Sequence, residues 1–175
     1  MRIEPFNVIW WGLLACIAVG ALLLWLLVGR CSERVRRRVL ITISGVNFIL
    51  FWVYKYWLSQ DVSYMQMYGI KGFELWFELP LQLCNINIWL IPLALALKRR
   101  SLLAFCFFTG LLGPFMAIVS PAEGFTGDVL MLRNLGFYVT HGLLLIVSIS
   151  LLTLGFFRPR ARDAIWAILL TAALT

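Results

Sequence analysis

The distribution of hydrophobic residues along the chain predicts a series of membrane-spanning helices. Because a helix rises about 1.5 Å per residue, roughly 20 apolar residues are needed to cross a bilayer. Five segments meet this length or come close to it, at about 8–29, 39–58, 74–97, 102–120 and 135–157. A sixth begins near Ala164 and has only about 12 residues before Thr175, which is too short to cross. We therefore predict an all-α polytopic transmembrane helical bundle with five full spans plus the start of a sixth. Residues 1–175 are expected to form a single transmembrane domain that is truncated at its C-terminus.

The composition supports an integral membrane protein. Hydrophobic residues make up 62% of the chain and charged residues 13%, against about 45–50% and 25% in soluble domains. The net charge of +7 could indicate nucleic-acid binding, but the basic residues fall in short loops between the apolar segments. That pattern is typical of membrane topology. The predicted partners are therefore membrane lipids, and nucleic acid is not among them.

The basic residues also predict the orientation of the chain. Eleven of the fifteen lie in the loops after the first, third and fifth spans, namely Arg30, Arg34, Arg36, Arg37, Arg38, Lys98, Arg99, Arg100, Arg158, Arg160 and Arg162. The opposite side holds Arg2, Lys71 and Arg133, and Lys55 lies within a span. Cytoplasmic loops carry an excess of Lys and Arg. We therefore place the N-terminus outside, in a protein integral to the plasma or cytoplasmic membrane.

Polar residues interrupt the third predicted span, in the stretch FELWFELPLQLCNIN at residues 73–87. On a helix with about 100° per residue, four of them share an arc of roughly 80°: Glu74, Glu78, Gln82 and Asn85. Cys84 and Asn87 fall outside this arc. Polar side chains within a membrane normally face a bundle interior or a water-filled cavity. The arc therefore predicts an inward-facing polar stripe.

The second and fifth predicted spans carry polar residues at similar depths in the outer half of the bilayer. Counting about 1.5 Å per residue from the outer boundary, the depths agree to within about 4 Å. The pairs expected to meet are Asn47 with Asn85, Lys55 with Glu78, and His141 with Gln82 or Glu78.

His141 is the only histidine in the chain. It can serve as a structural hydrogen-bonding residue between helices. Alternatively, a neighbouring carboxylate can orient the ring and raise its basicity, which suits proton transfer. Cys84 is a candidate nucleophile beside the stripe, although a buried cysteine commonly packs as a small hydrophobe. One histidine with scattered carboxylates predicts no metal site, and no cofactor is predicted.

Several motifs from the third predicted span onward resemble a known family. ELPLQLCNINIWL resembles an ELPLHLC-type third helix, GLLGPFMAIVSP a fourth helix that ends in a proline turn, and YVTHGLLL a fifth helix with an HHG or SHG motif. On these motifs the chain resembles the YwaF-like integral membrane proteins. That family is similar to a eukaryotic transmembrane acyltransferase group acting on ether phospholipids. Pro80, Leu83, Cys84, His141 and Gly142 match its motifs.

The resemblance implies an acyltransferase-like enzyme with a polar cavity in the outer leaflet. In this hypothesis His141 is the general base, Glu78 orients it, and Cys84 accepts the acyl group. The ester or headgroup is bound by Gln82, Asn85, Asn47 and Lys55. Gln82 stands where the family commonly has histidine, so a mechanism with two histidines is not available. The alternative is a non-catalytic transport or binding protein, in which the stripe forms a wet vestibule or a structural network.

Overall fold

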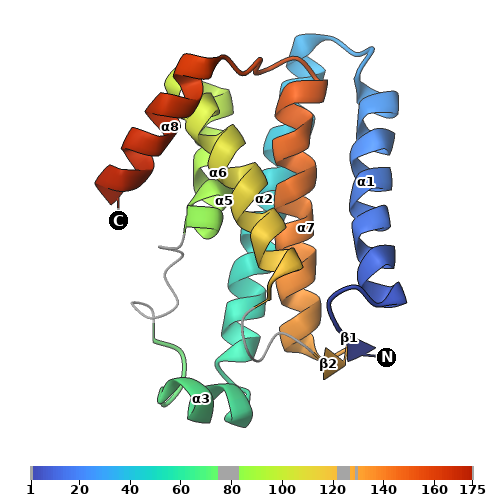
Figure 1. The fold of residues 1–175 in the computed structure, drawn as a ribbon, viewed down its shortest axis with the longest axis vertical. Helices are drawn as coiled ribbons and strands as arrows, with labels where there is room; N and C mark the ends of the chain where they lie inside the picture. Colours follow the sequence, from blue (N-terminus) through green and yellow to red (C-terminus); the bar gives the residue numbers. More distant parts are fainter. Residues whose placement is uncertain (1, 75–82, 122–126, 129, 175) are drawn as a thin grey trace.

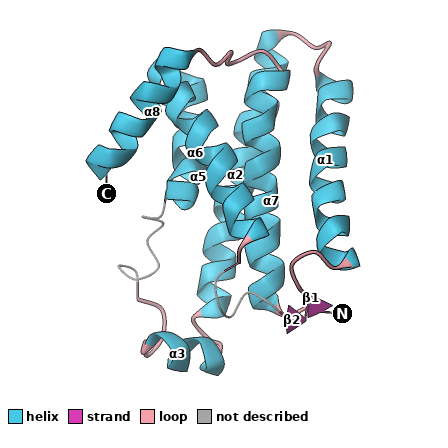
Figure 2. Ribbon diagram, in the orientation of Figure 1, coloured by secondary structure: helices cyan, strands magenta, loops and turns pink. Residues whose placement is uncertain are grey.

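A computed structural model describes residues 2–74, 83–121, 127–128 and 130–174. Long helices lie side by side in a bundle (Figure 1). They are α1 (Val8–Val28), α2 (Glu33–Leu58), α5 (Leu83–Leu97), α6 (Arg100–Val119), α7 (Leu132–Thr153) and α8 (Ala161–Leu174), with a short α3 (Val62–Tyr68). Two strands of two residues each, β1 (Arg2–Ile3) and β2 (Gly127–Asp128), pair antiparallel at one end (Figure 2). The prediction of an all-helical bundle is confirmed.

Four of the described helices are long and apolar enough to cross a membrane, namely α1, α2, α6 and α7. They match four of the predicted spans, but α2 begins at Glu33, earlier than the predicted start at residue 39. The early start reflects a capped polar turn, since the Ser32 side chain accepts a hydrogen bond from the Val35 amide. Of the predicted span 74–97, the structure describes α5, and residues 75–82 lie outside the described part. Helix α8 has 14 residues.

Helix α7 lies at the centre of the bundle, because α1, α2 and α6 all pack against it. Helix α5 packs between α2 and α6, and α8 packs on α6. Lipid tails are as apolar as leucine, so membrane helices associate through close van der Waals packing, and small residues bring their backbones together. Gly136 on α7 lies against the ring of Tyr54 on α2, and Gly110 on α6 lies against Ser148 on α7. These glycines allow the close approaches that fix α7 between its neighbours.

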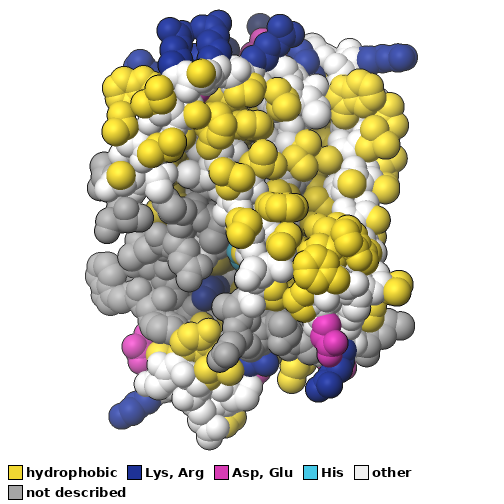
Figure 3. Space-filling model, in the orientation of Figure 1, with side chains coloured by type: hydrophobic (Ala, Val, Ile, Leu, Met, Phe, Trp, Pro, Cys, Tyr) yellow, Lys and Arg dark blue, Asp and Glu magenta, His cyan; other side chains and the backbone are white. Residues whose placement is uncertain are grey.

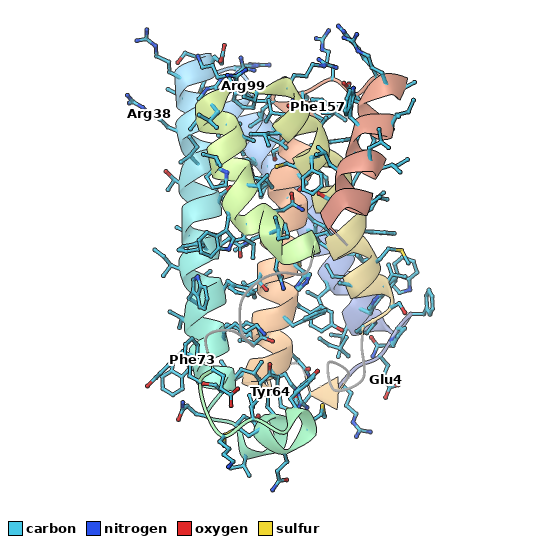
Figure 4. All side chains as sticks on the ribbon, turned by 90° about the vertical axis from the view of Figure 1, so that its left-hand side faces the viewer. Glu4, Arg38, Tyr64, Phe73, Arg99 and Phe157 are labelled. Atoms are coloured by element: carbon cyan, nitrogen blue, oxygen red, sulfur yellow. The ribbon has the colours of Figure 1, made fainter. Side chains whose placement is uncertain are left out.

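The three basic loops lie at the same end of the bundle. The space-filling view shows Lys and Arg side chains concentrated there, with apolar side chains over the flank of the helices (Figure 3). Arg38 and Arg99 lie at this basic end, and Glu4 lies at the opposite end (Figure 4). The clustering expected from alternating spans is therefore present in the fold.

Arginines at the basic end connect α2 to the C-terminal ends of two other helices. The Arg36 guanidinium donates to the carbonyl of Leu154, directly after α7, at 2.6 Å. Arg37 donates to the carbonyl of Leu95, in the last turn of α5. The last carbonyls of a helix lack partners within it and carry partial negative charge, so cations there are favourable. The basic loops thus stabilise the packing of the bundle as well as marking one side of it.

A further ion pair joins α6 to α8. Arg100 donates to both carboxylate oxygens of Asp163, from Nη2 at 2.5 Å and from Nε at 3.2 Å. The same carboxylate accepts a hydrogen bond from the Arg160 amide at 2.9 Å, which caps the start of α8. Asp163 is buried, with 5% of its surface exposed. This carboxylate therefore fixes the N-terminus of α8 against α6.

We expect Asp163→Asn to lower the unfolding temperature by a few degrees at neutral pH. The hydrogen bond from Arg100 holds the pKa of Asp163 below its usual 3.8. A lowered pKa stabilises the fold above the usual value, and this stabilisation is lost as the pH falls through the folded-state value. The difference between wild type and variant should therefore shrink below about pH 4, the range of an unperturbed aspartate. Thermal unfolding in detergent across pH measures it. An equal effect from Glu4→Gln, which is exposed, would contradict the assignment.

Helix α1 is tied to α6 by one buried hydrogen bond. The indole Nε1 of Trp10 donates to the carbonyl of Ile118 at 3.0 Å, and Trp10 is 3% exposed. We expect Trp10→Phe to lower the free energy of unfolding by about 1–3 kcal/mol, because the hydrogen bond is lost, the Ile118 carbonyl is left unpaired and the smaller ring leaves a void. Thermal unfolding in detergent measures this loss. Trp25→Phe on the same helix is the control, since Trp25 is 46% exposed. Equal losses in the two variants would show that the hydrogen bond contributes nothing.

Candidate functional site

Three of the predicted polar residues, one from each of the second, third and fifth predicted spans, lie in the bundle interior. Asn47 on α2 is 1% exposed, Asn85 on α5 is 8% exposed, and His141 on α7 is 7% exposed. Burial of polar groups within a membrane is costly, and such residues commonly mark functional sites. These three residues define the described part of the candidate site.

The ring of His141 has a fixed tautomer. Its Nδ1 lies 2.8 Å from the carbonyl oxygen of Phe137, one turn earlier in α7. A carbonyl only accepts hydrogen bonds, so Nδ1 carries the proton and Nε2 of the neutral ring holds a lone pair. The ring also packs against that of Phe137, with centroids 4.3 Å apart and the two planes tilted by 34°. Backbone and aromatic contacts thus orient His141 and leave Nε2 as its proton acceptor.

Asn47 reaches the backbone of α7 beside His141. Its Nδ2 donates to the carbonyl of Thr140 at 3.1 Å. The depth count paired Asn47 with Asn85, but the structure pairs it with Thr140, because depth sets the level of a residue and not the helix that it faces. The Oδ1 of Asn47 is buried and accepts no hydrogen bond from any described residue. Buried polar atoms are normally satisfied, so this oxygen is available to a water or a ligand.

The two other described candidates lie nearer the protein surface. Lys55 is half-buried on α2, and its Nζ lies 5.9 Å from the centre of the Phe51 ring. Glu74 is exposed just before the segment that is not described. Glu74 is therefore not one of the buried residues of the predicted stripe.

A second group of polar residues, Asn87, Thr109 and Ser148, lies deeper in the bundle. The helical spacing did not predict it, because it placed Asn87 outside the stripe. Asn87 is fully buried, and its Nδ2 donates to Thr109 Oγ1 on α6 at 2.9 Å. A Cβ at Gly110 would touch both Asn87 and Ser148, so the three helices meet here. Ser148 follows His141 by seven residues, or two helical turns, and that spacing was the signal available in the sequence.

Several predicted site residues cannot be placed. Glu78 and Gln82 lie outside the described residues, and so does the side chain of Cys84. Their expected contacts with Lys55 and His141 stay predictions. Within the described ranges, no group of three His, Cys, Asp or Glu residues could hold a metal ion.

An apolar groove runs along the outside of α2 and α7, level with the site. It has a volume of about 460 Å³ and is lined by residues that include Tyr54 and Trp57 on α2 and Gly136 and Thr140 on α7. Thr140 directly precedes His141. The groove therefore brings the hydrocarbon region next to the backbone that carries the histidine.

Comparison with known proteins assigns the chain to a family. Searches of curated proteins and of solved structures gave no significant match. The TMEM164 family is matched over residues 4–175, which include every helix described above. The apolar helices agree with a transmembrane family. The chain is therefore an integral membrane protein and a member of the TMEM164 family.

Proposed function

We propose that the protein is a membrane enzyme that transfers acyl chains between lipids, with His141 as the general base. The observation that carries the proposal is the hydrogen bond from His141 Nδ1 to the Phe137 carbonyl. In the neutral ring this contact puts the proton on Nδ1, so Nε2, inside the bundle, is the nitrogen that can accept a proton. Covalent acyl transfer needs an oriented base within reach of a nucleophile, and in this proposal the nucleophile is Cys84.

The chemistry has two half-reactions. His141 Nε2 takes the proton of the Cys84 thiol, and the thiolate attacks the ester carbonyl of a donor phospholipid. The C–O bond breaks, a thioester forms on Cys84, and the departing lysophospholipid oxygen receives the proton from His141. A second lysophospholipid then gives its hydroxyl proton to His141 and attacks the thioester. The new ester forms, and the released thiolate regains the proton.

The other site residues have supporting roles in this proposal. Glu78 stabilises the protonated ring, and Gln82 and Asn85 bind the ester or headgroup. The open Oδ1 of Asn47 accepts a hydrogen bond from the substrate, and Lys55 binds the headgroup. The groove between α2 and α7 admits an acyl chain from the bilayer.

In this proposal the chemistry takes place in the outer leaflet of the plasma or cytoplasmic membrane. The positive-inside rule assigns the basic end to the cytoplasm, so the N-terminus and the end of α2 that holds Lys55 face outside. The clustering of Lys and Arg at one end supports this orientation (Figure 3).

The proposal is tested with purified protein in phosphatidylcholine vesicles that also contain a lysophospholipid. The donor carries an isotope-labelled acyl chain, and mass spectrometry follows the label. We expect the label to appear in the acceptor in proportion to the amount of protein. Transfer no faster than in protein-free vesicles, for both diacyl and ether acceptors, would reject the enzyme.

A structural role is the second candidate, favoured by the hydrogen bond from Asn47 to Thr140 between α2 and α7. In that case the polar residues hold the helices in register and perform no chemistry. Asn47→Ala and His141→Ala would then lower the unfolding temperature, and no acyl transfer would be found in wild type.

A further inference from the structure

The geometry points to a binding site for an anionic phospholipid between α6 and α8, at the basic end of the bundle. It lies away from His141, since Thr153 at the end of α7 is twelve residues, or about 18 Å, beyond that histidine. The inference therefore holds whether or not His141 is catalytic.

A polar pocket forms the headgroup part of this site. It has a volume of about 270 Å³ and is lined by Arg100, Ser101, Ala104, Arg162, Asp163 and Trp166. Arg162 is exposed and makes no hydrogen bond or ion pair with any residue in the described ranges. Its charge helps to lower the pKa of the neighbouring Asp163, and because the side chain is exposed it can also meet an anion from solution or from the membrane.

The carboxylate in the pocket does not oppose an anion strongly. Asp163 is turned inward, with both oxygens bound by Arg100 and one also bound by the Arg160 amide. The side chain of Arg100 remains 43% exposed while it makes this pair. Arg100 also donates to the Arg158 carbonyl at 2.9 Å, and its charge is balanced by Asp163, so the net positive charge of the pocket comes from Arg162.

The start of α6 adds hydrogen-bond donors to the same pocket. Arg99 is the N-cap of α6 and makes no side-chain capping hydrogen bond. The first amide groups of a helix have no partner within it, and together with the helix dipole they favour a phosphate. The Ser101 hydroxyl is exposed beside them.

A separate apolar groove lies further along the same two helices. It has a volume of about 610 Å³, and its lining includes Phe108 and Leu112 on α6 and Ala164 and Ile168 on α8. Phe108 is one turn beyond Ala104 of the polar pocket. A charged pocket above an apolar groove matches the two parts of a phospholipid, a phosphate headgroup and an acyl chain.

The level of the pocket agrees with a membrane surface. Trp166 lines it and is 59% exposed, and tryptophan is enriched at the headgroup level of membranes. With the basic end on the cytoplasmic side, the pocket faces the leaflet that holds anionic lipids. Charge complementarity thus selects an anionic phospholipid as the occupant.

The test is a titration of phosphatidylglycerol into the detergent-solubilised protein, with native mass spectrometry counting bound lipids and phosphatidylcholine as the neutral comparison. We expect wild type to prefer phosphatidylglycerol. Arg162→Gln should weaken its binding about fivefold, the contribution of one basic residue at an anionic surface. Ala164→Phe, which fills the groove without changing charge, should also weaken it.

The matched control is Arg38→Gln. Arg38 is exposed at the same end but projects from the side away from Phe157 and the start of α8 (Figure 4). Binding in this variant should equal that of wild type. Equal affinity for both lipids in wild type, or equal losses in Arg38→Gln and Arg162→Gln, would overturn the site. The site would also be overturned if inorganic phosphate displaced phosphatidylglycerol as effectively as the lipid itself does. The same holds if Ala164→Phe changed only the oligomeric state and left lipid binding unchanged.

Discussion

Replacing His141 by glutamine is expected to lower the rate of acyl transfer by a factor of about 10²–10⁴, the usual contribution of a general base. Glutamine is polar and fills a similar volume, but it cannot accept and return a proton at neutral pH. It can still donate a hydrogen bond to the Phe137 carbonyl, which His141 reaches in the native protein. The variant should therefore insert and fold while losing the chemistry. Label transfer between phospholipids in vesicles measures the rate.

Ser148→Ala is the matched control for the histidine variant. Ser148 is buried on the same helix, and its hydroxyl has no hydrogen-bond partner among the described residues. The proposal gives it no role in acyl transfer, so this variant should keep the wild-type rate. A His141→Gln variant that transfers label at the wild-type rate per folded molecule would remove His141 from the mechanism. Cys84→Ala tests whether the acyl group passes through a covalent intermediate, because a wild-type rate of label transfer in this variant would exclude a thioester on Cys84.

The largest expected effect on stability comes from Gly136→Ala. A Cβ at this position would collide with the ring of Tyr54, which is buried at 8% exposure between α2 and α7. The contact involves the base of the ring, so a small rotation does not relieve it, and the helices must separate. Overpacking of this kind costs about 1–3 kcal/mol. Thermal unfolding in detergent should show a clear decrease in the midpoint.

The sign of this effect identifies its cause. In an open helix interior, replacing glycine by alanine favours the helix by about 1 kcal/mol. Gly45→Ala on α2 is the control, because a Cβ there meets no atom within 4 Å. It should leave the midpoint unchanged or raise it. Adding Tyr54→Leu to Gly136→Ala should recover part of the loss, and a Gly136→Ala protein as stable as wild type would show that α2 and α7 tolerate a wider separation.

The helices were largely predictable, because a bilayer imposes one length and one polarity on each segment that crosses it. The predicted segment 8–29 agrees with α1 (Val8–Val28), and 102–120 agrees with α6 (Arg100–Val119). The start of α2 was predicted too late, since its first turns are polar and their helical form depends on the cap at Ser32.

The sequence predicted the depth of the candidate site in the membrane, but it did not predict which residues contact one another there. Helical spacing and depth marked Asn47, Asn85 and His141 as residues of one region, and all three are buried. The same helical spacing placed Asn87 outside the polar stripe, although Asn87 is fully buried and bonds Thr109 of α6. A helical wheel describes one helix alone, whereas α5 has α2 on one side and α6 on another. A polar residue off the predicted face can thus find a partner on a different neighbour.

The sequence by itself determined which segments are apolar enough for a membrane and where the basic residues cluster, because these follow from the local solvent preference of each side chain. The tertiary structure alone decided the contacts of those residues. It set the tautomer of His141 through Phe137, paired Asn47 with Thr140, and joined Arg100 to Asp163. Such contacts depend on the rotation and spacing of packed helices, which close approaches at glycines such as Gly136 control and which no single helix encodes.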